Sequence, residues 1–233
     1  MLQIEYDLKQ NAKGCLIGIL VMTGIDNFNS CNALEEVKRK LERELGKEYG
    51  QMTRQELKRI HPMAVYVGYY KKFGYTYHVL SQLESVAHGK RIPNVSALVE
   101  AMFMAELKNM LLTAGHDLEK IKQPLLVKVS TGSESYLGIN GKSLTTTPGD
   151  IMIRDGESVI SSILKGPDSR TRISATTRQV LFTIYAPEGI PEDMVLRHMN
   201  DIEAYVRVFS PGAETQVKRV TSRGRASNIA LQS

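Results

Sequence analysis

The sequence has few cysteines, no long apolar run and no secretion signal. Only two of its 233 residues are cysteines, Cys15 and Cys31. Two cysteines do not make a disulfide framework or a metal site, and we expect two buried, reduced thiols. No apolar stretch approaches the roughly 20 residues that span a bilayer. The first residues also lack the basic head, apolar body and cleavage site of a signal peptide. We therefore expect a cytoplasmic protein without membrane contact.

Common catalytic and cofactor motifs are also missing. The five histidines are scattered, with no HExxH-like pair and no cysteine partner, so we expect no metal site and no cofactor. The stretch Gly138–Ser143 ends in Gly-Lys-Ser but lacks the full Walker spacing, and it is better interpreted as a β-turn. No G-x-S-x-G nucleophile elbow is present.

The positive charge is unevenly distributed along the chain. The formal net charge is +5, and the residues from Lys218 onward hold four cations and no acid. The preceding part is therefore close to neutral, which makes global basicity a weak argument for nucleic-acid binding. The argument for RNA must come from local clusters, of which the segment 165–178, with a net charge of +3, is the clearest.

Hydrophobic periodicity changes from helical to strand-like at about Pro124. The first half favours two opening strands, at 2–8 and 15–22, and helices at 33–45, 62–73, 78–87 and 95–112. The second half favours strands at 125–129, 136–139, 143–146, 151–153, 159–163 and 180–185, then a helix that ends near Phe209. Turn residues at 140–141 and 155–156 predict antiparallel pairs. Helices followed by a run of strands and a covering helix indicate an α+β domain.

The most informative segment is Lys165–Phe182, which runs from a Gly-Pro turn to an apolar strand. Its guanidinium and hydroxyl groups suit a phosphate or a carboxylate, which predicts an anion-binding loop. The alternative is that an acid pairs with one arginine while the threonines satisfy the turn. These side chains are Lys165, Asp168, Arg170, Thr171, Arg172 and Arg178.

His116 and Asp117 form a second candidate pair. They follow the predicted long helix, where they are placed to act as an oriented base near a cleft. In the alternative interpretation, His116 caps the carbonyl end of that helix and Asp117 caps the next turn.

From about Pro62 to Pro211 the chain resembles the B3/B4 domain of the phenylalanyl-tRNA synthetase beta subunit, and free-standing proteins built on that domain. The resemblance rests on ordered motifs: Tyr70–Gly74, Lys90–Asn94, Ala114–Leu118, Pro148–Asp150, Asp168–Thr171 and Thr177–Phe182. It implies a three-layer sandwich of two β-sheets and a helical layer, and a connection to tRNA. The domain division that follows is an N-terminal extension at 1–61, a B3/B4-like domain at 62–213 and a basic, disordered tail at 214–233.

In the synthetase, this domain hydrolyses tyrosine wrongly attached to the tRNA for phenylalanine. Aligned on Asp117, the position of a histidine in the editing domains is Ala114 here, and Thr183 stands where they have a glutamate. An inherited editing mechanism is therefore not expected, and nothing in the chain resembles the aminoacylation domain of a ligase. We expect a tRNA- or RNA-binding protein.

Two alternatives remain open. One is a hydrolase of mischarged tRNA or of a free aminoacyl compound that uses His116 and Asp117, with a pocket between the strand 180–185 and the end of the long helix. The other is a protein that binds an amino-acid-like small molecule, having kept the amino-acid pocket and lost the tRNA. The predicted ligand- or RNA-binding residues are Asn94, Lys165, Asp168, Arg170, Thr171, Arg172, Arg178 and Thr183.

Overall fold

The computed structural model describes residues 2–7, 14–29, 31–221 and 227–229. Their helices are α1 (Asn32–Tyr49), α2 (Arg54–Leu57), α3 (His61–Lys72), α4 (His78–Ala87), α5 (Ala97–Asn109) and α6 (Glu192–Phe209). The strands of the first half are β1 (Leu2–Asp7), β2 (Leu16–Thr23), β3 (Leu112–Asp117), β4 (Leu125–Val129), β5 (Ser135–Leu137) and β6 (Ser143–Thr145). The later strands are β7 (Ile151–Arg154), β8 (Val159–Ser162), β9 (Gly166–Pro167), β10 (Val180–Ala186), β11 (Glu214–Thr221) and β12 (Ser227–Ile229).

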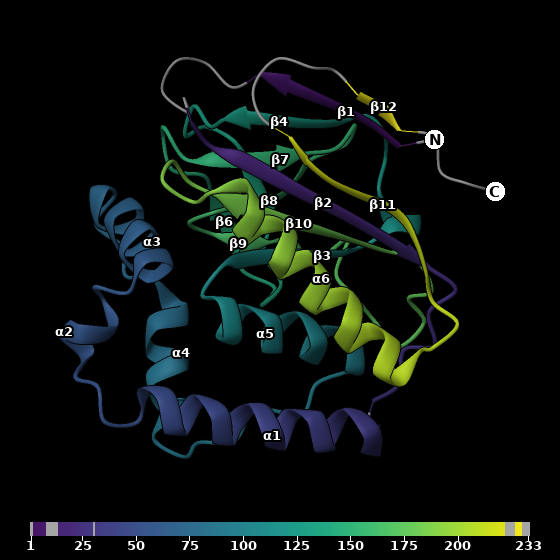
Figure 1. The fold of residues 1–233 in the computed structure, drawn as a ribbon. Coiled ribbons are helices and arrows are strands. Elements are labelled where there is room, and N and C mark those ends of the chain that lie inside the picture. The colour runs from purple at the N-terminus through teal and green to yellow at the C-terminus, as the bar shows by residue number, and fades with distance from the viewer. Residues whose placement is uncertain (1, 8–13, 30, 222–226, 230–233) are drawn as a thin grey trace.

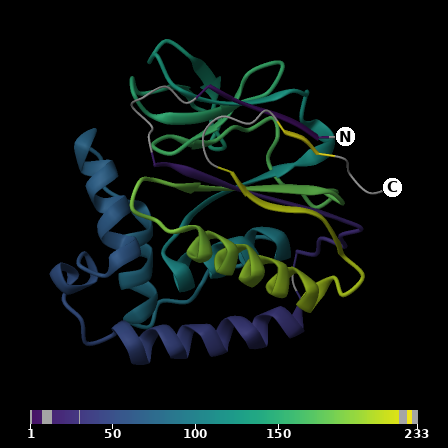
Figure 2. The same cartoon turned by 45° about the horizontal axis from the view of Figure 1, so that its top comes forward.

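The strands form two large sheets and one small hairpin. One sheet has the order β12-β1-β4-β7-β8-β9, the second has the order β11-β2-β10-β3, and β5 pairs with β6. The two sheets lie above one another, with α5 and α6 beneath the four-stranded sheet and α1 below them (Figures 1 and 2). The expected α+β sandwich of two sheets and a helical layer is confirmed.

Strand β10 is at the centre of the four-stranded sheet. All seven of its residues are buried, and it pairs antiparallel with β2 on one side and β3 on the other. Its apolar run Val180–Tyr185 therefore behaves as predicted for a core strand. Because β2 comes from the segment 1–61, that segment contributes an inner strand of this sheet. The boundaries at 61 and 213 remain predictions.

Two predicted helix ends are wrong. Helix α5 ends at Asn109 rather than 112, because Met110 adopts a left-handed conformation with φ of 58°, and residues 112–117 form β3. A uniformly apolar run does not distinguish a buried helix from a buried strand, which explains the error. Helix α1 continues through Gly46 to Tyr49. Gly46 has no side chain, which leaves room for the carbonyl oxygen of Ala87. That oxygen lies 3.4 Å from the position that a Cβ atom of residue 46 would take.

The predicted disordered tail is also wrong where the structure describes it. Residues Glu214–Thr221 form β11 along β2, and Ser227–Ile229 form β12 along β1. A register shift between Thr215 and Val217 interrupts the alternation of β11, so its sequence shows no strand period. Residues 222–226 and 230–233 of the predicted tail lie outside the described part of the chain.

Candidate functional site

Arg170 is held inside a local cluster of acids. Its guanidinium lies 2.7 Å from Asp155 Oδ2 and 3.6 Å from Glu157 Oε1, and it donates to the carbonyl of Lys120 at 2.8 Å. Asp168 lies 3.8 Å from its Nε. The guanidinium is therefore already neutralised by protein carboxylates. Between the two interpretations of this segment, the structure favours the local ion pair for Arg170.

Asp168 and Thr171 are buried and bonded to each other. The backbone N–H and the hydroxyl of Thr171 both donate to the Asp168 carboxylate. Burial raises the pKa of this carboxyl, while the two Thr171 hydrogen bonds and the charge of Arg170 act in the opposite direction. The two side chains are 3% and 0% exposed, which leaves no surface to contact a large ligand.

The remaining predicted binding residues are separated from one another. Arg172 and Arg178 are exposed, and Arg178 donates to the carbonyls of Ala175 and Thr177 in its own loop. Asn94 is also exposed, but it does not cap α5, whose N-cap is Ser96. Its side-chain oxygen instead accepts a hydrogen bond from Lys38 Nζ at 2.6 Å.

His116 lies on β3 and is fully buried, not beside a cleft at the end of a helix. Its Nδ1 lies 2.7 Å from Thr171 Oγ1, and its Nε2 lies 3.3 Å from Ser161 Oγ. Since Thr171 donates its proton to Asp168, Nδ1 must be the protonated nitrogen. The pKa of His116 is lowered to about 3, mainly by burial, with the charge of Asp155 acting against this effect and the charge of Arg170 adding to it. His116 is therefore neutral at pH 7.

Asp117 also makes structural contacts. Its carboxylate accepts from Thr177 Oγ1 at 2.8 Å and from the backbone N–H of Glu119 at 3.2 Å, and it lies 3.3 Å from Lys120 Nζ. The expectation that the pair faces a cleft is wrong, because strand geometry places both groups in the interior. A catalytic role for His116 and Asp117 stays an untested prediction that this geometry does not favour.

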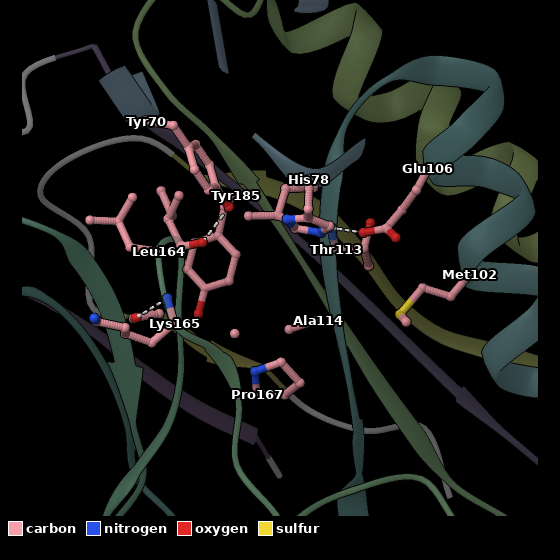
Figure 3. Close-up of a pocket in the computed structure, with 14 residues that line it drawn as sticks. Tyr70, His78, Met102, Glu106, Thr113, Ala114, Leu164, Lys165, Pro167 and Tyr185 are labelled. Carbon is pink, nitrogen blue, oxygen red and sulfur yellow. Dashed lines mark hydrogen bonds between the residues drawn. The ribbon is translucent and has the colours of Figure 1, made fainter. Parts of the chain in front are cut away.

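A cavity of about 260 Å³ opens between the two sheets and the helical layer (Figure 3). It lies beside Tyr185 of β10 and the second half of α5, where the pocket was expected. Its walls are mostly apolar, and its polar groups come from three helices (α3, α4 and α5), three strands (β3, β8 and β10) and the loop after β8. The lining residues are Tyr70, His78, Met102, Glu106, Leu112, Thr113, Ala114, Ser162, Ile163, Leu164, Lys165, Gly166, Pro167 and Tyr185.

Ala114 and Thr183 are directly paired beside this cavity. They are cross-strand partners in the β3–β10 ladder, and Thr183 Oγ1 donates to the carbonyl of Ala114 at 3.4 Å. Directly opposed residues share one face of a sheet, which here is the face that carries Tyr185 two residues further along β10. Ala114 lines the cavity, whereas Thr183 is fully buried and does not line it.

The cavity contains one acid, Glu106, that the sequence analysis missed. One carboxylate oxygen accepts from the backbone N–H of Thr113 at 2.7 Å, and the side chain points from α5 toward the pocket (Figure 3). Burial raises its pKa to about 8. The sequence signal for it was a carboxylate within the Ala-, Met- and Leu-rich run of α5, which holds two glutamates, Glu100 and Glu106, since such helices rarely bury an acid without a purpose.

Lys165 lies at the edge of the same cavity with an aromatic neighbour. Its Nζ lies 2.6 Å from the hydroxyl of Tyr75 and 4.7 Å from the centre of that ring. Tyr75 is 38% exposed, so the two side chains present a cation and an aromatic face to solvent. Of the predicted binding residues, Lys165 alone lines this cavity.

Within the described residues, no group of three or more His, Cys, Asp or Glu side chains is placed to hold a metal ion. In the same residues, no helix combines the length and the apolar character that crossing a bilayer needs.

Comparison with known families identifies the domain. A family profile described as B3/4 domain matches residues 82–198, which is half of the chain. The chain belongs to the B3/4 domain family. No curated protein matches it at a significant level. Among solved structures it is similar to an N-terminal fragment of the phenylalanyl-tRNA synthetase beta-subunit from Pyrococcus horikoshii, with a TM-score of 0.49 and 11% identity. That match covers 95% of this chain and about half (54%) of the synthetase fragment.

The part of the chain that matches the B3/4 family supplies most of the cavity wall. Helix α5, β3, the loop after β8 and β10 all lie between residues 82 and 198, whereas Tyr70, His78 and Tyr75 precede it. The first 81 residues therefore supply part of the pocket wall and rim. This B3/4 protein builds its site from both segments.

Proposed function

We propose that this B3/4 domain protein binds the aminoacyl end of a charged tRNA in the cavity and does not hydrolyse the ester. The observation that carries the proposal is the Ala114–Thr183 pair at the cavity wall. These positions correspond to the two polar groups of the editing domains, and here they offer a methyl group and a hydroxyl committed to a carbonyl. A cavity is present at this place while those groups are absent.

The size and lining of the cavity fit an amino-acid side chain. A volume of about 260 Å³ is near the lower end of ligand pockets and large enough for one aromatic or aliphatic side chain. Its walls are apolar, with the rings of Tyr70 and Tyr185 among them. Binding of such a side chain is favoured by the burial of its apolar surface, at about 25 cal/mol per Å².

The edge of the cavity fits the nucleotide to which an amino acid is esterified. An exposed tyrosine ring supports base stacking, and a neighbouring ammonium group attracts phosphate. Tyr75 and Lys165 provide this combination. Arg172 and Arg178, being exposed, are the arginines left to contact the RNA backbone.

Hydroxyls near the cavity are poorly placed for nucleophilic catalysis. Ser162 Oγ accepts from the backbone N–H of Lys165, and Thr113 Oγ1 lies 2.7 Å from Nε2 of the buried His198. Burial lowers the pKa of His198 to about 4, so its imidazole is a weak base for activating the Thr113 hydroxyl. This arrangement supports binding over hydrolysis.

A panel of charged and uncharged tRNAs tests the proposal. We expect at least one charged tRNA to bind more tightly than its uncharged form, while the lifetime of its ester is unchanged or longer. Ala114→Phe, which fills the cavity, should abolish the preference for the charged form. Ala204→Phe on the exposed side of α6 is the matched control and should retain it.

Two results would reject the proposal. Equal affinity for charged and uncharged tRNA would remove the aminoacyl group from the interaction. Accelerated ester hydrolysis that is lost in His116→Ala would instead establish the hydrolase alternative.

A further inference from the structure

Glu106 has no cation beside it, unlike most of the other buried acids. Four of those acids have a basic partner: Glu42 pairs with Arg39, Glu100 with Lys38, Asp155 with Arg170, and Glu203 with Lys218. Asp150 is buried and also has no cation among the described residues, but each of its carboxylate oxygens accepts a hydrogen bond, from the Tyr69 hydroxyl and from the Leu164 N–H. Glu106 is 5% exposed and forms no ion pair with any described residue. A buried carboxylate without a compensating charge is costly, so its presence on a cavity wall indicates a ligand role.

The groups around Glu106 do not satisfy its second oxygen. Three phenols from α3 and the turn before α4 surround it, and each donates its proton to a backbone carbonyl. Tyr66 donates to Tyr185, Tyr70 to Ile163, and Tyr77 to Met110. The only hydrogen bond to the carboxyl from a described residue is that of the Thr113 N–H.

The other titratable groups near the cavity do not supply a positive charge to Glu106. His198 of α6 bonds to Thr113 Oγ1, and Lys165 bonds to Tyr75. His78 of α4 lines the cavity, and burial lowers the pKa of its ring, so it is largely neutral at pH 7. No described cation therefore neutralises an ionised Glu106.

We propose that Glu106 is the counter-ion for a primary ammonium group of the ligand in this cavity. The free carboxylate oxygen, the aromatic faces of Tyr70 and Tyr185 and the apolar enclosure all favour an organic cation. The inference rests on the proposed function, in which the cation is the α-ammonium group of the aminoacyl moiety. It adds that the pocket recognises this ammonium group and binds a neutral analogue less tightly.

Charge balance gives the proposal a specific signature. With its pKa raised to about 8 by burial, Glu106 holds a proton at pH 7 in the empty pocket. An ammonium group stabilises the ionised form, so binding expels that proton to the solvent. At pH 7 the carboxyl is roughly 90% protonated, and close to one proton is released for each ligand bound.

Calorimetry with phenethylamine and its neutral counterpart 2-phenylethanol tests this. For the full-length protein at pH 7, we expect phenethylamine to bind roughly tenfold or more tightly than the alcohol. Its binding heat should change with the ionisation enthalpy of the buffer, in the sense of proton release. The buffer dependence should disappear at pH 9, where Glu106 is already ionised.

Glu106→Gln is the decisive variant because it keeps an oxygen to accept from the Thr113 N–H but cannot ionise. It should lose the preference for the amine and the proton release, with an unchanged or raised melting temperature. Glu36→Gln, at an exposed position on α1, is the control and should behave as wild type. Equal binding of amine and alcohol, or proton release that persists in Glu106→Gln, would overturn the inference.

The two proposals fail separately. If charged tRNA binds but the amine effect is absent, the role of Glu106 is wrong and the aminoacyl site stands. If the amine binds with proton release but charged tRNA shows no preference, the cavity serves a free amine instead.

Discussion

The three arginines of the segment 165–178 fall into two groups according to their surroundings in the structure. Arg170 is enclosed by Asp155, Glu157 and Asp168, whereas Arg172 and Arg178 are exposed. Sequence reasoning ranked all three alike, because the acids that neutralise Arg170 include residues 13 and 15 positions earlier. Pairing at that separation is a property of the fold and is not visible in local composition.

RNA contacts should therefore depend on the exposed arginines. We expect Arg172→Ala and Arg178→Ala each to weaken tRNA binding and to reduce the slope of log K against log salt by about one. Arg170→Ala should leave that slope unchanged and lower the free energy of unfolding by about 2 kcal/mol, since Asp155 loses its partner in a partly solvated site. Salt titrations and chemical denaturation measure the two effects. A slope reduced by Arg170→Ala alone would contradict this assignment.

The prediction of the site residues from sequence was limited in a similar way. Lys165 and the neighbourhood of Tyr185 were predicted from sequence and line the cavity. Glu106 was missed because an acid in a helical run is normally interpreted as solvent-facing. His116 was selected because a histidine beside an aspartate resembles an oriented base, yet both side chains stabilise contacts between β3 and the 168–177 loop.

Among secondary-structure elements, the β3–β10 ladder is central to the proposed function. Its register places Ala114 opposite Thr183, so the two positions that the proposal compares with polar groups of the editing domains meet at one location. Most strands were predicted because their period is two. Strand β3 was not, because it directly follows an apolar helix, and β11 was not, because a bulge interrupts its alternation.

Restoring polar groups at this ladder should introduce hydrolysis. The double variant Ala114→His, Thr183→Glu places an imidazole and a carboxylate on facing strands, about 5 Å apart at their Cβ atoms. We expect it to deacylate tyrosyl-tRNA for phenylalanine at a rate on the order of 10²-fold above the wild-type protein, the range typical of general acid–base catalysis. Ester hydrolysis measures the rate.

The single variants are the controls for the double variant, and we expect each to show little activity. A correctly folded double variant without activity would contradict the view that these two positions separate binding from editing in this protein. Circular dichroism and melting temperature establish whether it is folded.

For the molecule as a whole, the free energy of unfolding should depend on pH through two sets of buried groups whose effects oppose each other. His116 and His198 have lowered pKa values, so they destabilise the fold as the pH falls below 6.5. Asp150 and Glu106 have raised pKa values, mainly because of burial, so the folded state holds their protons more tightly than the unfolded state. The unfolded-state histidines and Asp150 have lost most of their protons above about pH 7, which leaves Glu106 as the main contributor between pH 7 and 8.

The free energy of unfolding should therefore decrease as the pH rises from 7 to 8. The folded state binds a proton at Glu106 that the unfolded state has already lost, so the slope reaches at most about 1.4 kcal/mol per pH unit. Denaturant titrations across this range measure it. Glu106→Gln should flatten the profile, and an unchanged slope in that variant would assign the effect to another group.

The global architecture was largely predictable. Alternation and turn residues predict the antiparallel strands of residues 125–163, and their order after the helices indicates the α+β class. The inner position of β2 was not predictable, because pairing between residues 16–23 and 180–186 is set by tertiary packing. The cavity likewise depends on residues from distant elements.

Methyl NMR with a non-hydrolysable 3′-aminoacylamino-adenosine tests the central claim most directly. Resonances of Ala114, Leu112, Ile163 and Leu164 report on the cavity, and that of Val95, exposed before α5, reports on the surface outside it. We predict saturable shifts at the four cavity methyls, little change at Val95, and no response to adenosine alone. Unchanged cavity methyls at saturating analogue would contradict an aminoacyl-binding site in this pocket.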